Sequence, residues 1–200
     1  MGENFRILEE IYVMGKILGA GLTSQGVVVP ASTMGDGVFT LAKGNRPSAF
    51  SRVSQPALET GDIALMNIAD PLGNKFLVNP TTVLGSPADK FVIAKLLNSA
   101  LQPSVPTTSP GDTGYVMAVN PLQGLYGMKI SRFLPTGAWL LGDFKKGLVF
   151  QRRDPLEIMQ ENPASGASFI QDVFKFRARS RFEVDWIESR FAWEGDDGTV

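Results

Sequence analysis

The stretch that decides the fold lies near the C-terminal end of the chain: Phe174-Lys-Phe-Arg-Ala-Arg-Ser-Arg-Phe-Glu-Val-Asp-Trp186. Two kinds of side chain alternate through it without interruption. The first kind is apolar or small: Phe174, Phe176, Ala178, Ser180, Phe182, Val184 and Trp186. The second kind is charged: Lys175, Arg177, Arg179, Arg181, Glu183 and Asp185. Because successive side chains of a strand point to opposite faces, the pattern predicts one long strand with an apolar and a charged face.

Such a strand would be unusually long. At about 3.3 Å per residue it would extend roughly 40 Å, whereas an ordinary strand has about five or six residues. We therefore expect it to organise the fold, with other elements covering its aromatic side. Its charged side begins with a basic stripe, made of Lys175, Arg177, Arg179 and Arg181. The stripe is either a solvated face or a surface that contacts a neighbouring subunit or a polyanion.

The composition is that of an ordinary globular protein. The chain has 200 residues, of which 44% are hydrophobic and 20% charged, with a net charge of -1. This is enough for one domain with a real core or for two small lobes. The sequence contains no cysteine and no histidine. Their absence excludes disulfides, thiolate chemistry, serine–histidine triads and most zinc sites.

The acidic residues are scattered and form no metal-ligand pattern. We therefore expect no catalytic residue, no cofactor and no metal site. A hydrolase that works with paired carboxylates is the alternative among enzymes, and no pair of acids in the sequence supports it.

Two helices are predicted in the first third of the chain. Residues 4–18 carry apolar side chains at three- and four-residue spacing, and Asn4 can cap the start. Ser54 or Gln55 can cap the second helix, which has Pro56 in its first turn and extends to about residue 68. Gly61 should weaken this helix.

A third helix is predicted from a variant of the capping box. Ser86 is the expected cap, Pro87 the first helical residue and Asp89 the third, and the helix runs to about Leu101. Ser86 could instead be a catalytic nucleophile, but Lys90 lies four residues on rather than three, so capping is favoured.

Short strands, turns and one long loop fill the rest of the chain. The predicted extended segments are residues 75–78, 80–84, 115–119, 126–130, 137–143, 148–153 and 156–159. Turns are expected at Asp70-Pro-Leu-Gly-Asn74, at 120–124 and at 144–147. The segment 102–114 is rich in proline, serine and threonine, which predicts an exposed loop and a candidate for contacts between subunits.

The order of these motifs resembles that of the tailed-phage major capsid proteins with the Hong Kong phage fold. In that family a helix precedes an aspartate–glycine turn, a short apolar strand, a proline-led extended piece, and a helix that ends in serine or asparagine. The corresponding segments here are residues 57–66, 70–73, 76–78, 80–84 and 91–99. The tryptophan motif at 138–143 and the arginine-rich strand before Phe191-Ala-Trp193 fit the same family. The resemblance covers about residues 4–193.

The resemblance implies an α+β fold with two lobes. A peripheral lobe would contain a spine helix and a long-stranded sheet, and an axial lobe would form the centre of hexamers and pentamers. Residues 1–45 would be the end of the spine helix and the start of the peripheral lobe. Residues 46–137 would be mostly axial lobe, and residues 138–200 would return to the peripheral lobe with the long C-terminal strand.

The resemblance also implies a function without catalysis. The chain would be the structural subunit of an icosahedral viral capsid that assembles in the host cytoplasm. Its partners would be copies of itself in hexamers and pentamers, other capsid or decoration proteins, and packaged DNA on the inner face, with no membrane. Two alternatives stay open: the shell of an encapsulin-like compartment, and a module that contacts nucleic acid through the basic stripe, residues 175–181.

The chain departs from the family at its start. Family members usually carry an N-terminal arm and a long extended hairpin before the spine helix, and the sequence before residue 4 has no room for either. The chain would then be a fragment, a processed product or an unusually short member of the family, and it would lack these two sources of contact between subunits.

Overall fold

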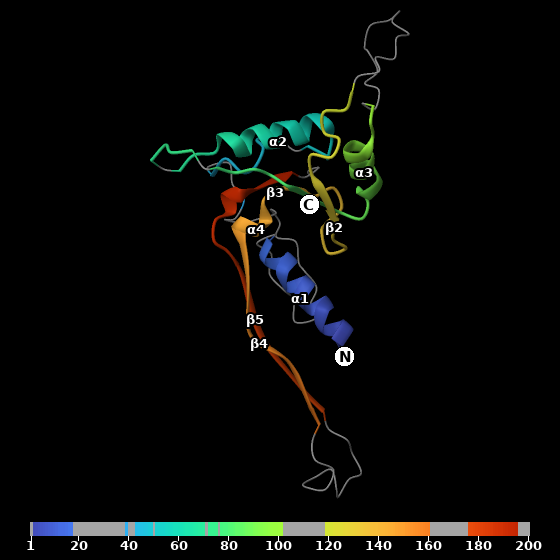
Figure 1. The fold of residues 1–200 in the computed structure, drawn as a ribbon, viewed down its shortest axis with the longest axis vertical. Coiled ribbons are helices and arrows are strands. Elements are labelled where there is room, and N and C mark those ends of the chain that lie inside the picture. The colour runs from blue at the N-terminus through green and yellow to red at the C-terminus, as the bar shows by residue number, and fades with distance from the viewer. Residues whose placement is uncertain are drawn as a thin grey trace, which may run out of the picture.

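The protein is described here by a computed structural model, which covers residues 2–17, 39, 43–49, 51–70, 72–75, 77–101, 119–160 and 176–195. In chain order the elements are α1 (Gly2–Ile17), α2 (Gln55–Asn67), β1 (Thr82–Gly85), α3 (Lys90–Asn98), β2 (Gly127–Ile130), β3 (Trp139–Gly142), α4 (Phe144–Gly147), β4 (Leu148–Gln160), β5 (Phe176–Trp186), the short 3-10 helix η2 (Ser189–Phe191) and β6 (Ala192–Gly195). This mixture of helices and sheets confirms the predicted α+β class. Figure 1 shows a body that contains α2, α3 and one sheet, and a long ribbon of β4 and β5 that leads away from it.

A four-stranded sheet with the order β2-β1-β3-β6 lies at the centre of the body. The β1–β2 pair is parallel, whereas β3 is antiparallel to both β1 and β6. All four residues of β3 and all four of β6 are buried. Strand β3 reads as a short apolar run rather than an alternating pattern because both faces of the sheet are covered, and β6 carries one buried charged residue, Glu194.

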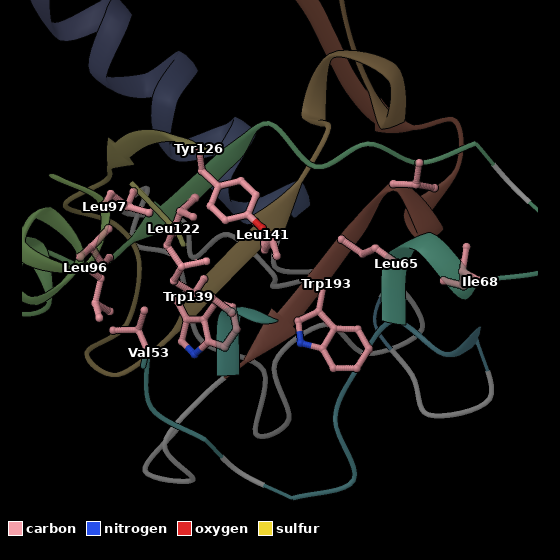
Figure 2. Packing of buried hydrophobic residues seen from close by; sticks show 14 residues of the cluster. Val53, Leu65, Ile68, Leu96, Leu97, Leu122, Tyr126, Trp139, Leu141 and Trp193 are labelled. Atoms are coloured by element: carbon pink, nitrogen blue, oxygen red, sulfur yellow. The ribbon is translucent and has the colours of Figure 1, made fainter. Parts of the chain in front are cut away.

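Each face of the sheet contributes to its own hydrophobic cluster. On one face, side chains of α2 and α3 pack on Val83, Trp139, Leu141 and Trp193. Figure 2 shows Trp139, Leu141 and Trp193 in this cluster together with Leu65 of α2 and Leu96 of α3. On the other face, Leu84, Leu140 and Ala192 pack with Met14 and Ile17 at the end of α1. The sheet therefore joins α1 to α2 and α3.

Two glycines permit close approach inside the body. A Cβ atom at Gly142 would lie 2.5 Å from the backbone oxygen of Phe191 and 2.8 Å from Cα of Ala192, so β3 and β6 need a residue without a side chain there. A Cβ atom at Gly61 would lie 2.9 Å from the indole of Trp193. Gly61 costs α2 some helix propensity, but it lets the helix lie directly against the indole.

The second sheet has two strands, and in the described part of the chain β4 and β5 pair only with each other. Their antiparallel register runs from Leu148 opposite Trp186 to Gln160 opposite Phe176. Two irregularities interrupt β4, one on each side of Asp154, and Pro155 lies in the second. Proline cannot donate a hydrogen bond to a ladder, and β-bulges are among the few places in a sheet where it occurs.

The predictions for the helices are partly confirmed. The first helix agrees with α1 in its extent, but Asn4 lies inside this helix rather than at its cap, because α1 begins at Gly2. The second helix is α2, whose cap Ser54 accepts a hydrogen bond from the Ala57 backbone N–H at 3.4 Å. The prediction of a capping box at the start of the third helix is wrong. Residues 87–89 form a turn, α3 begins at Lys90, and the hydroxyl of Ser86 donates to Oδ2 of Asp89 at 2.7 Å. The helix also ends at Asn98, three residues before the predicted end.

The turn and strand predictions are mixed. Asp70 fixes its predicted turn by accepting hydrogen bonds from the backbone N–H groups of Leu72 and Asn74. The strand expected at 75–78 is reduced to a single bridge between Ala69 and Lys75 in the described residues. The strands expected at 148–153 and 156–159 are one strand, β4, because the bulges bend the ladder without ending it. The loop 102–114 and residues 115–118 lie outside the described residues.

The prediction for the long strand is right in its extent and partly right about its surroundings. Strand β5 begins at Phe176, with residues 174 and 175 outside the described part, and it ends at Trp186 as expected. The expectation that other elements cover its aromatic side holds only near the body, where Val184 is buried and Phe182 and Trp186 are half-buried, whereas Phe176 is exposed. The division of the chain into lobes at residues 45 and 137 stays a prediction. The four-stranded sheet combines β1 and β2 from the middle range with β3 and β6 from the last.

Candidate assembly surface

The ribbon of β4 and β5 is the part of the structure that exposes the most strand surface. Residues directly opposite each other in an antiparallel pair share a face, so the register defines two faces. The face that carries Phe176, Ala178, Phe182, Val184 and Trp186 is the aromatic face. The face that carries Arg177, Arg179, Arg181, Glu183 and Asp185 is the charged face. The two faces have different neighbours.

Helix α1 supports the aromatic face near the body. The ring of Tyr12 meets the ring of Phe182 edge-on, with 5.4 Å between the centroids. The indole N–H of Trp186 donates to the backbone oxygen of Lys16 at 3.2 Å, and Arg152 of β4 forms an ion pair with Glu9 at 2.6 Å. Figure 1 shows α1 beside the part of the ribbon that is nearer to the body. The ribbon is therefore anchored at one end.

Farther from the body, apolar side chains of the ribbon are exposed. Ile158 is 52% exposed, Met159 57% and Phe176 55%, whereas Phe150, which is nearer to the body and opposite Val184, is 42% exposed. An isolated two-stranded hairpin is marginally stable in water, and apolar groups on it favour a covering partner. This segment has the character of an interface rather than of a solvated surface.

The predicted basic stripe is only partly a row of cations. Lys175 lies outside the described residues, and Arg177 lies opposite Met159. Arg179 and Arg181 both contact the carboxylate of Asp154, at 3.5 and 3.7 Å to its Oδ2 atom. Glu157 lies opposite Arg179. Acids of the facing strand therefore reduce the positive charge of the stripe.

The alternation in the sequence did not indicate Asp154 on the charged face, because a bulge in β4 changes which side this residue faces. In a regular strand Asp154 would share a face with Arg152, which lies opposite Phe182. The irregularity between Arg152 and Asp154 places Asp154 opposite Arg181 instead. The Asp154-Pro155 dipeptide is the available signal, because a proline within a strand pattern indicates a bulge or an edge.

The charged face becomes acidic near the body. The hydroxyl of Tyr12 donates to Oε1 of Glu183 at 2.6 Å, and Nζ of Lys16 lies 3.5 Å from the same oxygen. The Tyr12 hydrogen bond holds the pKa of Glu183 below its ordinary value of 4.5. The same bond, with some help from burial and the charge of Glu183, raises the pKa of Tyr12 to about 12. Glu183 is therefore ionised at neutral pH.

A hollow of about 310 Å³ lies beside Glu183 and Asp185, the two acids of β5 on the charged face. It is lined by Val149, Gln151, Glu183, Asp185, Trp186 and Ile187. Val149 lies opposite Asp185 and Gln151 lies opposite Glu183, so the hollow is on the charged face. It combines carboxylates with apolar walls at the base of the ribbon.

The described residues contain no group of three or more histidine, cysteine, aspartate or glutamate side chains that could hold a metal ion. Among the helices that the structure describes, none is long and apolar enough to cross a membrane.

Comparisons with known proteins identify a family and a similar fold. The model of the phage capsid protein family matches residues 1–194. No curated protein sequence matches the chain. Among solved structures, the capsid of an empty GTA particle, computed with C5 symmetry, is similar to the chain with a TM-score of 0.51 and 13% sequence identity. The match covers 98% of this chain and 63% of that chain, so this chain spans less than two thirds of its structural neighbour.

The structural similarity shows a shared fold, and it confirms the capsid-type fold expected from the order of the motifs. The family match extends over nearly the whole chain, from residue 1, directly before α1, to the penultimate residue of β6. The chain belongs to the phage capsid protein family.

Proposed function

We propose that the chain is a structural subunit of an icosahedral viral capsid and that it assembles with copies of itself into hexamers and pentamers that enclose the genome. The family match and the capsid-type fold support this role. The observation that carries it is the ribbon of β4 and β5. Its strands have 13 and 11 residues, and it exposes several large apolar side chains.

The ribbon supports self-association for a physical reason. A two-stranded sheet with uncovered apolar groups loses little by binding a partner and gains the burial of those groups, at about 25 cal/mol per Å². A shell of identical subunits supplies such a partner to every copy. The proposed role is structural, and the chain contains neither histidine nor cysteine for nucleophilic or acid–base catalysis.

The remaining parts of the proposal follow from this role. The subunit would be located in the virion after assembly in the host cell. Packaged DNA would be on the inner face, and other capsid or decoration proteins would be further partners. A shell of the encapsulin type would use the same subunit contacts and would differ by enclosing protein cargo in place of DNA.

Contact of the ribbon with nucleic acid is a weaker proposal. Cations that neutralise phosphates would support it, because they give salt-dependent affinity. Against it, Asp154 already contacts Arg179 and Arg181, and Glu157 faces Arg179. Retention of the purified chain on DNA at low salt, lost at high salt, would favour this second role.

The mass distribution of the purified chain tests the main proposal. We expect light scattering and negative-stain imaging to show rings, capsomer-sized oligomers or closed shells in the absence of nucleic acid. A chain that stays monomeric at high protein concentration would contradict self-assembly of these 200 residues.

A further inference from the structure

The charged face of the ribbon carries two segments of opposite character. Arg177, Arg179 and Arg181 form the arginine end, which is farther from the body. Glu183 and Asp185 flank the hollow near the body and form the acidic end. The two ends lie on one continuous face of the same strand. Each copy of the chain therefore presents both a basic and an acidic surface to a neighbour.

Within one chain, the arginine end and the acidic end do not form ion pairs with each other. Arg177 lies opposite Met159 rather than an acid. Oδ1 of Asp185 accepts a hydrogen bond from the backbone N–H of Trp186 at 2.9 Å. Arg177 and Asp185 are eight residues apart in an extended strand, which is roughly 26 Å at about 3.3 Å per residue. They can form an ion pair only between different copies.

The hollow suits an arginine side chain. Its carboxylates can accept from the guanidinium group, which presents five N–H donors in a fixed plane. Its apolar walls, Val149, Trp186 and the 71% exposed Ile187, can cover the methylene stem. A volume of about 310 Å³ accommodates such a side chain.

A nucleic acid fits the whole face less well than a second copy does. The face carries three arginines, Arg177, Arg179 and Arg181. It also carries four acids, Asp154, Glu157, Glu183 and Asp185. Phosphates along the face would meet the acids at the base of the ribbon and between the arginines, and like charges repel. A second copy offers both signs in separate segments.

We propose that the charged face of the β4–β5 ribbon is a self-complementary interface, in which the arginine end of one copy docks on the acidic hollow of the next. The inference rests on the proposed self-association and specifies the surface that performs it. Because the two ends differ, repeated contacts of this kind run head to tail, and head-to-tail contacts generate rings when the rotation closes.

Charge reversal at the two ends tests the interface. The variants are Arg177→Glu, Asp185→Arg and their combination, with Lys90→Glu, at an exposed position of α3, as the matched charge-reversal control. Arg177 and Asp185 are chosen because Arg179 and Arg181 contact Asp154, and Glu183 contacts Tyr12, within the chain. Sedimentation velocity without nucleic acid measures the concentration needed for half-assembly at low and high salt. Circular dichroism checks that each variant folds.

We expect each single reversal to raise the half-assembly concentration by about tenfold or more, because it places like charges in contact. The combined variant should recover most of the loss, since the reversed ends complement each other. An equimolar mixture of the two single variants should also recover assembly, with the two variants in alternating order, because their intact ends complement each other and so do their reversed ends. Lys90→Glu should assemble as the wild type does.

Several results would overturn the interface. Single variants that assemble like Lys90→Glu would do so, as would a combined variant that remains as defective as the single ones. If Arg177→Glu lost retention on DNA but assembled normally, the arginine end would bind nucleic acid rather than a second copy. In these cases the wild-type chain still assembles and the proposed function stands. A wild-type chain that never assembles would overturn both.

Discussion

The sheet of the body and the ribbon use strands in opposite ways. Strand β3 has four residues, and all of them are buried. Strand β5 has 11 residues, of which only Val184 is buried. The short strand forms the core because helices and loops cover both faces of its sheet, whereas the long strand has one strand neighbour and partial cover from α1. The number of residues in a strand is therefore a poor guide to its contribution to the core.

The difference assigns separate tasks to the two regions. The body stabilises the single chain, because its apolar groups are already removed from water. The ribbon extends the molecule and retains exposed apolar and charged groups that a neighbouring copy can bind. Substitutions in the body should therefore change the stability of the single chain, and substitutions in the outer ribbon should change its assembly.

Ile93 in α3 gives the largest expected effect on stability. Its side chain is fully buried in the cluster between α3 and the sheet. Replacement by alanine removes buried methyl and methylene groups and leaves a cavity, so Ile93→Ala should lower the free energy of unfolding by about 2–5 kcal/mol. Denaturant unfolding, followed by circular dichroism on the unassembled chain, measures the change.

Gly85 provides a control for the packing of Ile93. A Cβ atom at Gly85 would lie 2.2 Å from Cδ1 of Ile93, so Gly85→Ala alone should cost about 1–3 kcal/mol through overpacking. In the double variant the added methyl group enters the space that Ile93→Ala vacates. The combined cost should therefore be smaller than the sum of the single costs. Strict additivity would contradict the contact between β1 and α3.

Tyr12 tests the junction between the two regions, with a smaller expected effect. The Glu183 hydrogen bond raises the pKa of Tyr12 from 10.0 to about 12 in the folded chain. A raised folded-state pKa contributes stability that is fully present below pH 10 and is lost as the pH rises toward 12. Tyr12→Phe should remove this part of the pH dependence, and Glu183→Gln should return the pKa of Tyr12 toward 10.0.

At low pH the stability depends on pH in the opposite direction, rising with pH. The pKa of Glu183 lies below its ordinary value of 4.5, so its contribution is present above pH 4.5 and is lost as the pH falls through the folded-state value. Difference titrations between each variant and the wild type isolate these two groups from Tyr126, whose pKa is also raised, mainly by burial. An unchanged slope between pH 10 and 12 in Tyr12→Phe would contradict the bond between α1 and β5.

Local signals predicted most of the elements. The alternation in residues 174–186 predicted β5, and the composition of residues 70–74 predicted a turn. A cap at Ser54 or Gln55, followed by Pro56, predicted the start of α2, and the structure selects Ser54. These signals depend on dihedral preferences and side-chain periods that act within a few residues. The order of the motifs also predicted the family and the fold.

Tertiary context decided what local signals could not. Residues 87–89 form a turn because Ser86 bonds to Asp89 rather than to the backbone of a helix. The bulges beside Asp154 place an acid among the arginines, a result that strict alternation does not predict. Alternation also says that a face is apolar without saying what covers it, so the exposure of Phe176 was not predicted. The cover of the outer aromatic face belongs to the proposed assembly rather than to the single chain.

Ile158 is the ribbon counterpart of Ile93 and gives the smallest expected effect on the single chain. It is 52% exposed and lies opposite Ala178 on the aromatic face. The same isoleucine-to-alanine change removes little buried area there, so Ile158→Ala should alter the free energy of unfolding by no more than about 0.5 kcal/mol. If a neighbouring copy covers this face, the substitution should still raise the concentration needed for assembly, because the interface loses apolar area. Denaturant unfolding and sedimentation velocity on the same preparation separate the two effects. A loss of chain stability comparable to that of Ile93→Ala would show that the outer ribbon is part of the core of the single chain, and the contrast between the two regions would then fail.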